Sequence, residues 1–246
     1  MNCNGIEYWK HPFASQKKVY KAGSREELLR ILDDIYGAGY ADSMIIQDFI
    51  PGDDTYMRVL TNYSDRNGNV KLMALGHVLL EEHTPHGIGN HAVIITEHNE
   101  EIAERFKKLL EDMHYIGFSN FDIKYDQRDK KYKVFEINTR QGRSNYYVTA
   151  AGQNIARYLV EDYIEQKPLD LKVVTEKSLW SVVPKGVAFR YIKPQEYKTE
   201  MRALIKSGQY VNPLFYKKDK GFLRTLRLLK SQLGHYYKYR KHLGRQ

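Results

Sequence analysis

Cysteine is almost absent from this chain of 246 residues, which contains only Cys3. A single cysteine excludes an internal disulfide framework and is typical of proteins in a reducing compartment. Long apolar runs are also missing, because no stretch approaches the roughly 18 consecutive apolar residues of a membrane-spanning helix. Residues 1–5 lack the basic region and following apolar segment of a secretion signal. We therefore expect a cytoplasmic globular protein.

Acidic residues are missing from the last part of the chain. From residue 220 onward there are many Lys and Arg residues but no Asp or Glu, so most of the net charge of +9 belongs to this segment. The rest of the chain is close to neutral. This distribution argues against a nucleic-acid-binding body and indicates a basic tail.

The spacing of apolar residues predicts a mixture of helices and antiparallel hairpins, which is an α+β chain. Ser24 and Glu27 form a capping box at the start of the first helix, and Asn99 caps the second. Residues 44–50 are expected to form a buried strand. Helices are predicted over 24–37, 99–113 and about 149–164, and further strands over 56–63, 70–80, 118–125 and 132–138.

The second predicted hairpin places polar side chains together. Alternation along its first strand gives one apolar face and one face that carries Asp122. If Asp126 pairs with Tyr132 across the connecting loop, Asp122 lies directly opposite Glu136, with Asn138 on the same face. The apolar face then pairs Phe121 with Ile137 and Ile123 with Phe135.

Two carboxylates that face each other on a sheet repel unless a cation lies between them. Mg²⁺ prefers a few hard oxygen ligands, with water and phosphate completing its shell. The alternative is a solvated face on which acidic residues happen to align, and this is the commoner explanation of a lone Asp/Glu pair. Asn138, followed by Arg140 and Arg143, favours the metal site.

Residues 135–144 resemble the E-x-N-x-R…S signature of the ATP-grasp superfamily. The resemblance implies that Asp122, Glu136 and Asn138 hold magnesium ions that bridge the phosphates of ATP. It also implies that Arg140 grips a phosphate or an acyl-phosphate intermediate. Arg143 is expected to assist, because a guanidinium group suits bidentate recognition of an oxyanion.

Residues 45–54 are similar to the hinge between the two lobes of ATP-grasp proteins. The resemblance implies that Gln47, Phe49 and Ile50 line the adenine slot and that Asp54 binds the ribose. It extends from about residue 18 to residue 164, and the order of hinge, substrate loop and the two metal-bearing strands matches.

ATP-grasp proteins also carry nucleotide-contacting lysines on a small lobe. The loop would be residues 5–16, and Lys17 or Lys18 would supply the second lysine; we take Lys18 as the ATP ligand. A first lysine is missing, so a truncated small lobe is expected. The expected domains are a remnant of the small lobe (1–47), a large metal-binding lobe (48–165) and a basic C-terminal extension (166–246).

Within the superfamily, residues 48–54, 80–85 and 138–147 look most like the D-aspartate ligase group. The resemblance implies phosphoryl transfer from ATP to a carboxylate, followed by attack of an amine. D-aspartate is the expected acid, and a peptidoglycan precursor is the expected amine acceptor. Magnesium and Arg140 would neutralise the charge that grows on the transferred phosphoryl group.

The loop of residues 82–91 lies between two strands on the expected active face. His86 and Asn90 are candidates for contact with the acid or the acceptor. The alternative, given at least equal weight, is that each only satisfies backbone groups of the loop. A zinc site formed by His83, His86 and His91 lacks cysteines and regular ligand spacing, and it is not favoured.

Residues 222–240 are expected to form a basic amphipathic helix, which Gly234 interrupts. Three interpretations are kept, in decreasing order of weight. The helix covers apolar surface of its own domain, or lies on an anionic membrane at its inner face, or binds nucleic acid. Its apolar face consists of Phe222, Leu226, Leu229, Leu233 and Tyr236.

Two rival functions stand beside the ligase. A non-catalytic nucleotide-binding or partner module would suit a chain without the first lysine. A nucleic-acid- or membrane-binding protein would make the carboxylates incidental, and it predicts strongly salt-dependent binding centred on the basic tail.

Overall fold

The computed structural model describes residues 2–3, 5–216, 218–219 and 221–244. Its largest element is an eight-stranded sheet in the order β10-β9-β5-β4-β3-β6-β7, with β8 paired to β4 outside that path. Neighbouring strands are antiparallel except β10 with β9 and β8 with β4. The strands are β3 (Met57–Ser64), β4 (Val70–Glu81), β5 (His91–Glu97), β6 (Gly117–Asp126), β7 (Lys131–Asn138), β8 (Lys172–Val173), β9 (Leu179–Ser181) and β10 (Tyr210–Val211).

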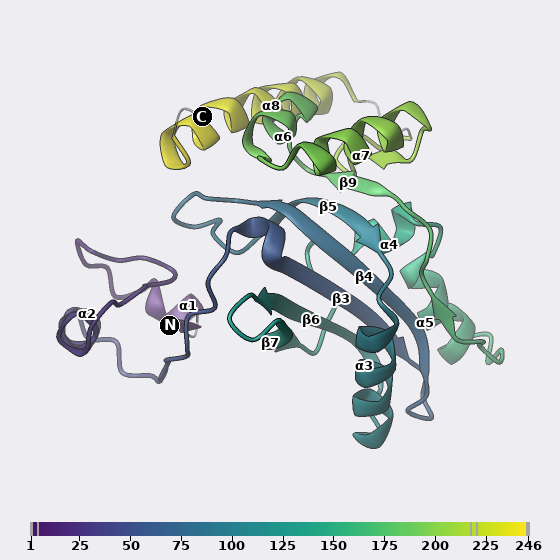
Figure 1. The fold of residues 1–246 in the computed structure, drawn as a ribbon, viewed down its shortest axis with the longest axis horizontal. Helices are drawn as coiled ribbons and strands as arrows, with labels where there is room; N and C mark the ends of the chain where they lie inside the picture. The colour runs from purple at the N-terminus through teal and green to yellow at the C-terminus, as the bar shows by residue number, and fades with distance from the viewer. Residues whose placement is uncertain (1, 4, 217, 220, 245–246) are drawn as a thin grey trace.

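Helices accompany this sheet, so the expected α+β class is confirmed (Figure 1). Figure 1 shows α6, α7 and α8 gathered beyond β9, and α1 and α2 to one side of the sheet. The helices are α1 (Gly5–Tyr8), α2 (Arg25–Gly37), α3 (Glu100–Asp112), α4 (Tyr146–Ala150), α5 (Ile155–Tyr163), α6 (Lys185–Tyr191), α7 (Gln195–Lys206) and α8 (Phe222–His242), with a 3₁₀ turn, η1 (Asp54–Tyr56), before β3.

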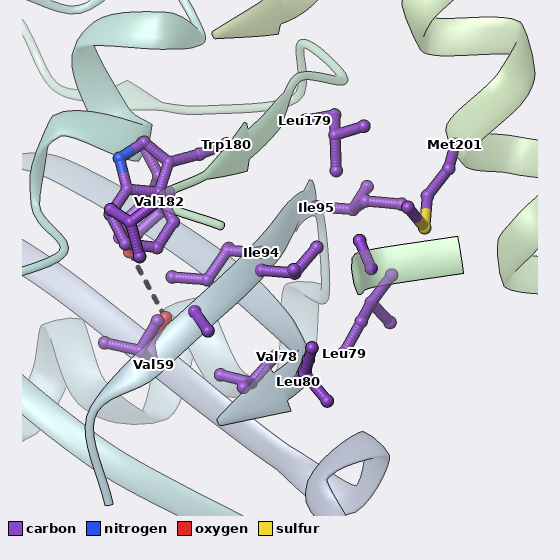
Figure 2. Close-up of a cluster of buried hydrophobic side chains, with 14 of the residues drawn as sticks. Val59, Val78, Leu79, Leu80, Ile94, Ile95, Leu179, Trp180, Val182 and Met201 are labelled. Carbon is purple, nitrogen blue, oxygen red and sulfur yellow. Dashed lines mark hydrogen bonds between the residues drawn. The ribbon is translucent and has the colours of Figure 1, made fainter. Parts of the chain in front are cut away.

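Apolar side chains bury both faces of the sheet. On one face, Leu60, Phe121 and Ile123 pack with Phe106 of α3. The other face carries a larger core in which β3, β4, β5 and β9 meet α4, α6 and α7. Figure 2 shows part of this core, including Met201 of α7. The predicted apolar face of residues 118–125 is therefore packed against a core, through Phe121 and Ile123.

The segment after residue 165 completes the central sheet. β8, β9 and β10 all come from it, and Trp180 of β9 is almost fully buried in the larger core. β9 pairs with β5, and β8 pairs with β4. The predicted domain boundary at residue 165 therefore separates strands that belong to one sheet.

Both predicted helix starts are confirmed. The amide of Glu27 donates to Ser24 Oγ at 3.2 Å, and the amide of Ile102 donates to Asn99 Oδ1 at 3.0 Å. The carboxylate of Glu27 accepts from the amide of Gly23 at 2.7 Å, one residue before the position that a capping box uses. The local sequence thus specifies where these helices begin.

The buried strand predicted at residues 44–50 is wrong. Only β2 (Met44–Ile45) is extended there, and it pairs with β1 (Asn2–Cys3) in a separate two-stranded ribbon. Ile45, Ile46 and Phe49 are each more than half exposed. An apolar run becomes a buried strand only when other elements cover it, and these three side chains are left largely exposed.

The predicted pairing of the second hairpin is confirmed at its acidic end. This hairpin is formed by β6 and β7, and Asp122 faces Glu136 directly. Phe121 faces Ile137 on the opposite side of the sheet. Ile137 is half exposed all the same, because β7 is the last strand of the sheet.

Nearer the turn the predicted pairing is wrong by one residue. Asp126 faces Lys131 instead of Tyr132, so the turn is one residue shorter than expected. A β-bulge between this end and the acidic end restores the predicted register. Ile123 accordingly faces Val134, and Phe135 is the bulged residue, which faces no residue of β6.

The single helix predicted at about 149–164 is wrong, because two helices occupy this region. α4 begins at Tyr146, and the break before α5 contains Gly152 with a φ of 94°. A glycine in this left-handed conformation commonly ends a helix. β5 is not among the predicted strands either, although the residues from Ala92 to Thr96 are all buried.

The predicted basic helix is α8, which continues unbroken through Gly234, so the predicted interruption is wrong. Gln232, His235 and Tyr239 are its buried residues. α8 covers its own domain, as one of the three interpretations expected, but with a different face: Tyr239 lies in the larger core. Its predicted apolar face is left exposed, since Phe222, Leu226, Leu229, Leu233 and Tyr236 are all exposed. The basic residues Lys220 and Arg245 lie outside the described part of the chain.

Within the described residues, no helix combines the length and the apolar character that a bilayer crossing requires.

Candidate functional site

Two carboxylates face each other at the centre of the predicted site. Burial, and then the charge of Glu136, raises the pKa of Asp122 to about 7. The charges of Arg140 and Lys18 act in the opposite direction on the same carboxyl group, so these predicted site residues lie within electrostatic range of it. Asp122 Oδ1 is buried and has no hydrogen-bond partner among the described residues. The centre is therefore acidic and under-neutralised.

Glu81, at the end of β4, extends this acidic centre. Burial, and then the charge of Asp54, raises the pKa of Glu81 to about 7, and Asp122 adds to the effect. Glu81 Oε1 is also buried without a hydrogen-bond partner in the described chain. Glu81 was not predicted as a site residue.

His91 lies between the two buried carboxylates. Its Nε2 is 3.8 Å from Glu81 Oε1 and 3.9 Å from Asp122 Oδ1. Burial lowers the pKa of His91 to about 4, so the ring is neutral near pH 7. His91 therefore supplies no charge to offset the acids. From the sequence, His91 was assigned no role apart from the zinc site that was not favoured.

A buried polar network fixes the turn that follows β7. Thr61 Oγ1 lies 2.9 Å from Asn120 Oδ1 and 3.2 Å from Asn145 Oδ1. Asn120 faces Asn138, the predicted third metal ligand. A Cβ atom at Gly142 would lie 2.8 Å from Asn145 Oδ1 and 3.0 Å from Asn120 Oδ1, so only glycine fits there. The turn that carries the predicted arginines is thus held against β3 and β6.

The two predicted arginines have different surroundings. Arg140 Nη1 donates to the carbonyl oxygen of Gln141 at 3.0 Å, and the side chain is exposed. Arg143 Nη2 lies 2.7 Å from Glu82 Oε1 and ties the turn to the loop of residues 82–90. Arg140 is therefore the arginine with donors to spare for an oxyanion.

The loop of residues 82–90 contacts the N-terminal segment. The rings of His86 and Trp9 are 4.8 Å apart, and Lys18 Nζ donates to the carbonyl oxygen of Ile88 at 2.8 Å. The carbonyl oxygen of Asn90 accepts from the amide of Glu82 at 2.8 Å. Asn90 thus closes the loop through its backbone, which leaves the role of its side chain as a prediction.

The predicted hinge is a surface segment without regular secondary structure before η1. Gln47 and Phe49 are exposed and Ile50 is half-buried. Asp54 opens η1, and its Oδ2 accepts from the amide of Glu81 and from His83 Nε2, both at 2.8 Å. The predicted ribose ligand is therefore already fixed to the strand that bears Glu81.

The residues present fit a magnesium ion. Asp122 and Glu136 oppose each other with the amide of Asn138 on the same strand, and Asp122 offers a buried oxygen with no other partner. Hard oxygen donors of this kind are what Mg²⁺ binds, with phosphate and water as its remaining ligands. Among the described residues no three His, Cys, Asp or Glu side chains form a metal-binding group by themselves. A protein-only zinc site from the loop histidines is thereby excluded for that part of the chain.

The chain belongs to the ATP-grasp family, whose fold the sequence predicted. Over 229 residues, or 91% of the chain, it is 45% identical to D-aspartate ligase from Enterococcus faecium (strain Aus0004). The chain spans about half of that relative, 54% of its length. No protein-family model matches the chain.

Solved structures resemble the chain over part of its length. The biotin carboxylase domain of Hydrogenobacter thermophilus 2-oxoglutarate carboxylase, solved with MgADP, ADP and bicarbonate, is 15% identical with a TM-score of 0.47. The match covers 63% of this chain and 36% of that one. L-amino acid ligase from Bacillus licheniformis is 21% identical with a TM-score of 0.34, covering 50% of this chain and 31% of that one.

Proposed function

We propose that the chain is a catalytic unit that uses ATP and Mg²⁺ to join a carboxylate to an amine. The observation that carries the proposal is the opposed pair Asp122 and Glu136, with Asn138 beside it, in a chain 45% identical to D-aspartate ligase. The charge of Glu136 adds to burial in raising the pKa of Asp122, and a cation held between the two carboxylates would relieve this repulsion.

The reaction has two steps. A carboxylate oxygen of the acid attacks the γ-phosphorus of ATP, the bond to the leaving oxygen breaks, and ADP and an acyl phosphate result. The amine nitrogen then attacks the acyl carbon, phosphate leaves, and the nitrogen loses a proton to give the amide. Mg²⁺ held by Asp122, Glu136 and Asn138 would neutralise the phosphates. Arg140, exposed beside the pair, would bind the phosphoryl oxygens, with Arg143 beside it.

The remaining predicted residues take their places around this centre. Gln47, Phe49 and Ile50 would contact adenine, and Asp54 the ribose. Lys18 would reach the phosphates from the N-terminal segment, which fits its influence on the pKa of Asp122. In this scheme residues 1–47 are the small lobe and 48–165 the metal-binding lobe, with residues 166–246 as an extension that shares its sheet.

For the substrates, we propose D-aspartate as the acid and a lysine side chain of a peptidoglycan precursor as the amine. The relative's name supports the acid. His86 and Asn90 belong to the loop that Arg143 ties to the arginine turn through Glu82, which supports contact with the acid or the acceptor. These assignments place the enzyme in the cytoplasm, where ATP is available.

The first experiment is calorimetric titration of MgATP into the chain and into the double variant Glu136→Ala/Asn138→Ala. We expect binding by the wild type and none by the variant. Glu104→Ala, a change at an exposed residue of α3, is the control and should bind normally. Equal binding by all three proteins would rule out the proposed metal site.

Turnover is tested by ADP release with D-aspartate and a lysine-containing peptide, with L-aspartate as the control acid. ADP release that requires both substrates supports the ligase. Nucleotide binding without ADP release under any of these conditions would instead identify a non-catalytic nucleotide-binding module.

We also propose that α8 rests on an anionic membrane surface. Leu226, Leu229 and Leu233 are exposed along a helix whose charged residues are all basic. Such a helix binds at the lipid interface through apolar burial and attraction to anionic headgroups. The wild type should sediment with phosphatidylglycerol vesicles but not with phosphatidylcholine vesicles. Leu229→Glu/Leu233→Glu should abolish this, Leu159→Glu should not, and salt-sensitive binding to RNA alone would favour the nucleic-acid alternative.

A further inference from the structure

The hairpin that carries the proposed metal ligands also grips the segment proposed to bind adenine. Arg128, in the turn between β6 and β7, pairs with Asp48 through Nη2 and Oδ2 at 2.7 Å. The rings of Tyr125 on β6 and Tyr56 in η1 are stacked, with centroids 6.5 Å apart. Gln127 Nε2 donates to the hydroxyl of Tyr56. The hairpin therefore contacts both ends of residues 48–56.

Lys124 provides the contact in the middle of that segment. Its Nζ donates to the carbonyl oxygen of Gly52 at 2.8 Å and lies 5.6 Å from the ring centroid of Phe49. Lys124 is two residues from Asp122 on the same strand, so their side chains project from the same face of the sheet. One strand thus carries both a proposed metal ligand and the hinge contact.

The hinge backbone is shaped to receive this bond. Gly52 has a φ of 113°, which only glycine adopts readily. A Cβ atom there would lie 2.6 Å from Cγ of Tyr56. Tyr56 in turn is held by the hairpin, so the direction of the Gly52 carbonyl group is fixed from two sides.

Lys124 lies among carboxylates. Burial lowers the pKa of Lys124, and the charges of Glu81, Asp54 and Asp53 act in the opposite direction. A second lysine, Lys21, places its Nζ 4.0 Å from the ring centroid of Phe49. Phe49 therefore lies between a cation from the N-terminal segment and one from the metal-bearing strand.

We propose that Lys124 is a positioning residue that holds the adenine-binding hinge in fixed register with the metal-binding strand. The inference rests on the proposed function, since it assumes that nucleotide binds across both. A nucleotide must meet the hinge with its base and the metal site with its phosphates at once. Without this contact, residues 48–54 would be mobile in the free protein and would have to become ordered when the nucleotide binds. The affinity for the whole nucleotide would then fall.

This role predicts different effects on two titrants. MgATP needs the hinge and the metal site, whereas magnesium tripolyphosphate needs only the metal site. In Lys124→Met, the Kd for MgATP should rise roughly tenfold, as expected for loss of a charge-assisted hydrogen bond. The Kd for magnesium tripolyphosphate should stay within about twofold of wild type on the same reasoning.

Two further variants complete the test. Lys124→Arg keeps a cationic donor and should restore MgATP binding to within about threefold of wild type. Lys131→Met removes an exposed lysine from the neighbouring strand and should change neither titration. Hydrogen exchange of residues 48–54 in the nucleotide-free protein should be faster in Lys124→Met than in wild type, and exchange in α3 should be unchanged. This readout also shows whether the variant is folded.

Each other outcome decides against the proposal. Equal weakening for both titrants would mean that Lys124 contacts phosphate directly. Unchanged MgATP affinity and unchanged hydrogen exchange would mean that the hinge needs no clamp. Failure of the wild type to bind either titrant would reject the proposed function itself, and the nucleotide-positioning role of Lys124 with it.

Discussion

Asp122 on β6 lies directly opposite Glu136 on β7, and a β-bulge one step along the strands separates this pair from the hairpin turn. The pair shares its face with the turn that carries Arg140. Like charges in this arrangement cost stability until a cation joins them. The energetic cost of the site and the Mg²⁺ binding that we propose for it therefore have the same origin.

The pH dependence of stability should reveal this cost. The folded-state pKa of Asp122 is about 7, above the value near 4 of an unfolded chain, so the folded state binds more protons between these values. In a chelating buffer, the contribution of Asp122 to the free energy of unfolding should thus fall as pH rises from about 4 to about 7. Asp122→Asn should reduce this fall by about 1–3 kcal/mol. Denaturant unfolding at pH 5 and pH 8 measures it, and identical losses in both proteins would contradict the assignment.

His77 should act with the opposite sign. Burial, and then the charge of Arg58, lowers the pKa of His77 to about 3, and the ring donates to the carbonyl oxygen of Thr55. Between about pH 3 and 6.5 the unfolded chain binds the additional proton, so stability should rise with pH. His77→Gln keeps a donor and should flatten this rise. His91 contributes in the same direction, so in the variant the free energy of unfolding should still rise with pH, but less steeply. The difference in bound protons between the unfolded and folded states, which sets this slope, should fall by about one; an unchanged slope would count against the prediction.

Gly76 should tolerate no side chain. A Cβ atom there would lie 2.7 Å from Cγ2 of Ile94 and 3.0 Å from Cγ1 of Val59. Gly76→Ala should therefore lower the free energy of unfolding by about 1–3 kcal/mol, measured by urea denaturation. Gly37→Ala is the matched control, because a Cβ atom at Gly37 would meet nothing within 4 Å. That change should be neutral or stabilise by up to about 1 kcal/mol.

Tyr239 should stabilise the start of the loop of residues 82–90. Its hydroxyl donates to the carbonyl oxygen of Glu81 at 2.7 Å. Tyr239→Phe should cost about 1 kcal/mol, because the carbonyl group loses its partner. Tyr237→Phe, at a residue 67% exposed, should cost almost nothing. Hydrogen exchange at residues 81–84 should be faster in the first variant alone. Equal exchange in both variants would mean that α8 does not stabilise the loop.

Local sequence was sufficient where the chain determines its own geometry. The caps at Ser24 and Asn99 depend on residues within one helical turn, and both are confirmed. The alternation that places Asp122 on one face and Phe121 on the other depends only on the strand repeat. The acidic pair followed from that alternation and an assumed turn. The predicted turn was one residue too long, and a bulge at Phe135 compensates for that error. Nothing in the local sequence predicts this bulge.

Residues that join the site from distant strands escaped prediction. Glu81 is the last residue of β4 and His91 is the first residue of β5. The strands that lie beside these two residues in space cannot be inferred from spacing along the chain. Lys124 lies two residues from Asp122 in the sequence, but no sequence pattern indicated that it is a site residue. The outward apolar face of α8 was predicted to be buried, because an amphipathic pattern shows which residues share a face and not what that face meets.

The bond between Tyr239 and Glu81 joins residues separated by 158 positions. At roughly 5–20 residues per second, a ribosome needs on the order of ten to thirty seconds to add that much chain. In the middle of this interval, β3 to β7 have been synthesised while β9, β10 and α8 have not. The nascent protein therefore passes through a stage in which the acidic centre is assembled on an open sheet edge, and a chaperone that shields the edge of β5 would act at that stage.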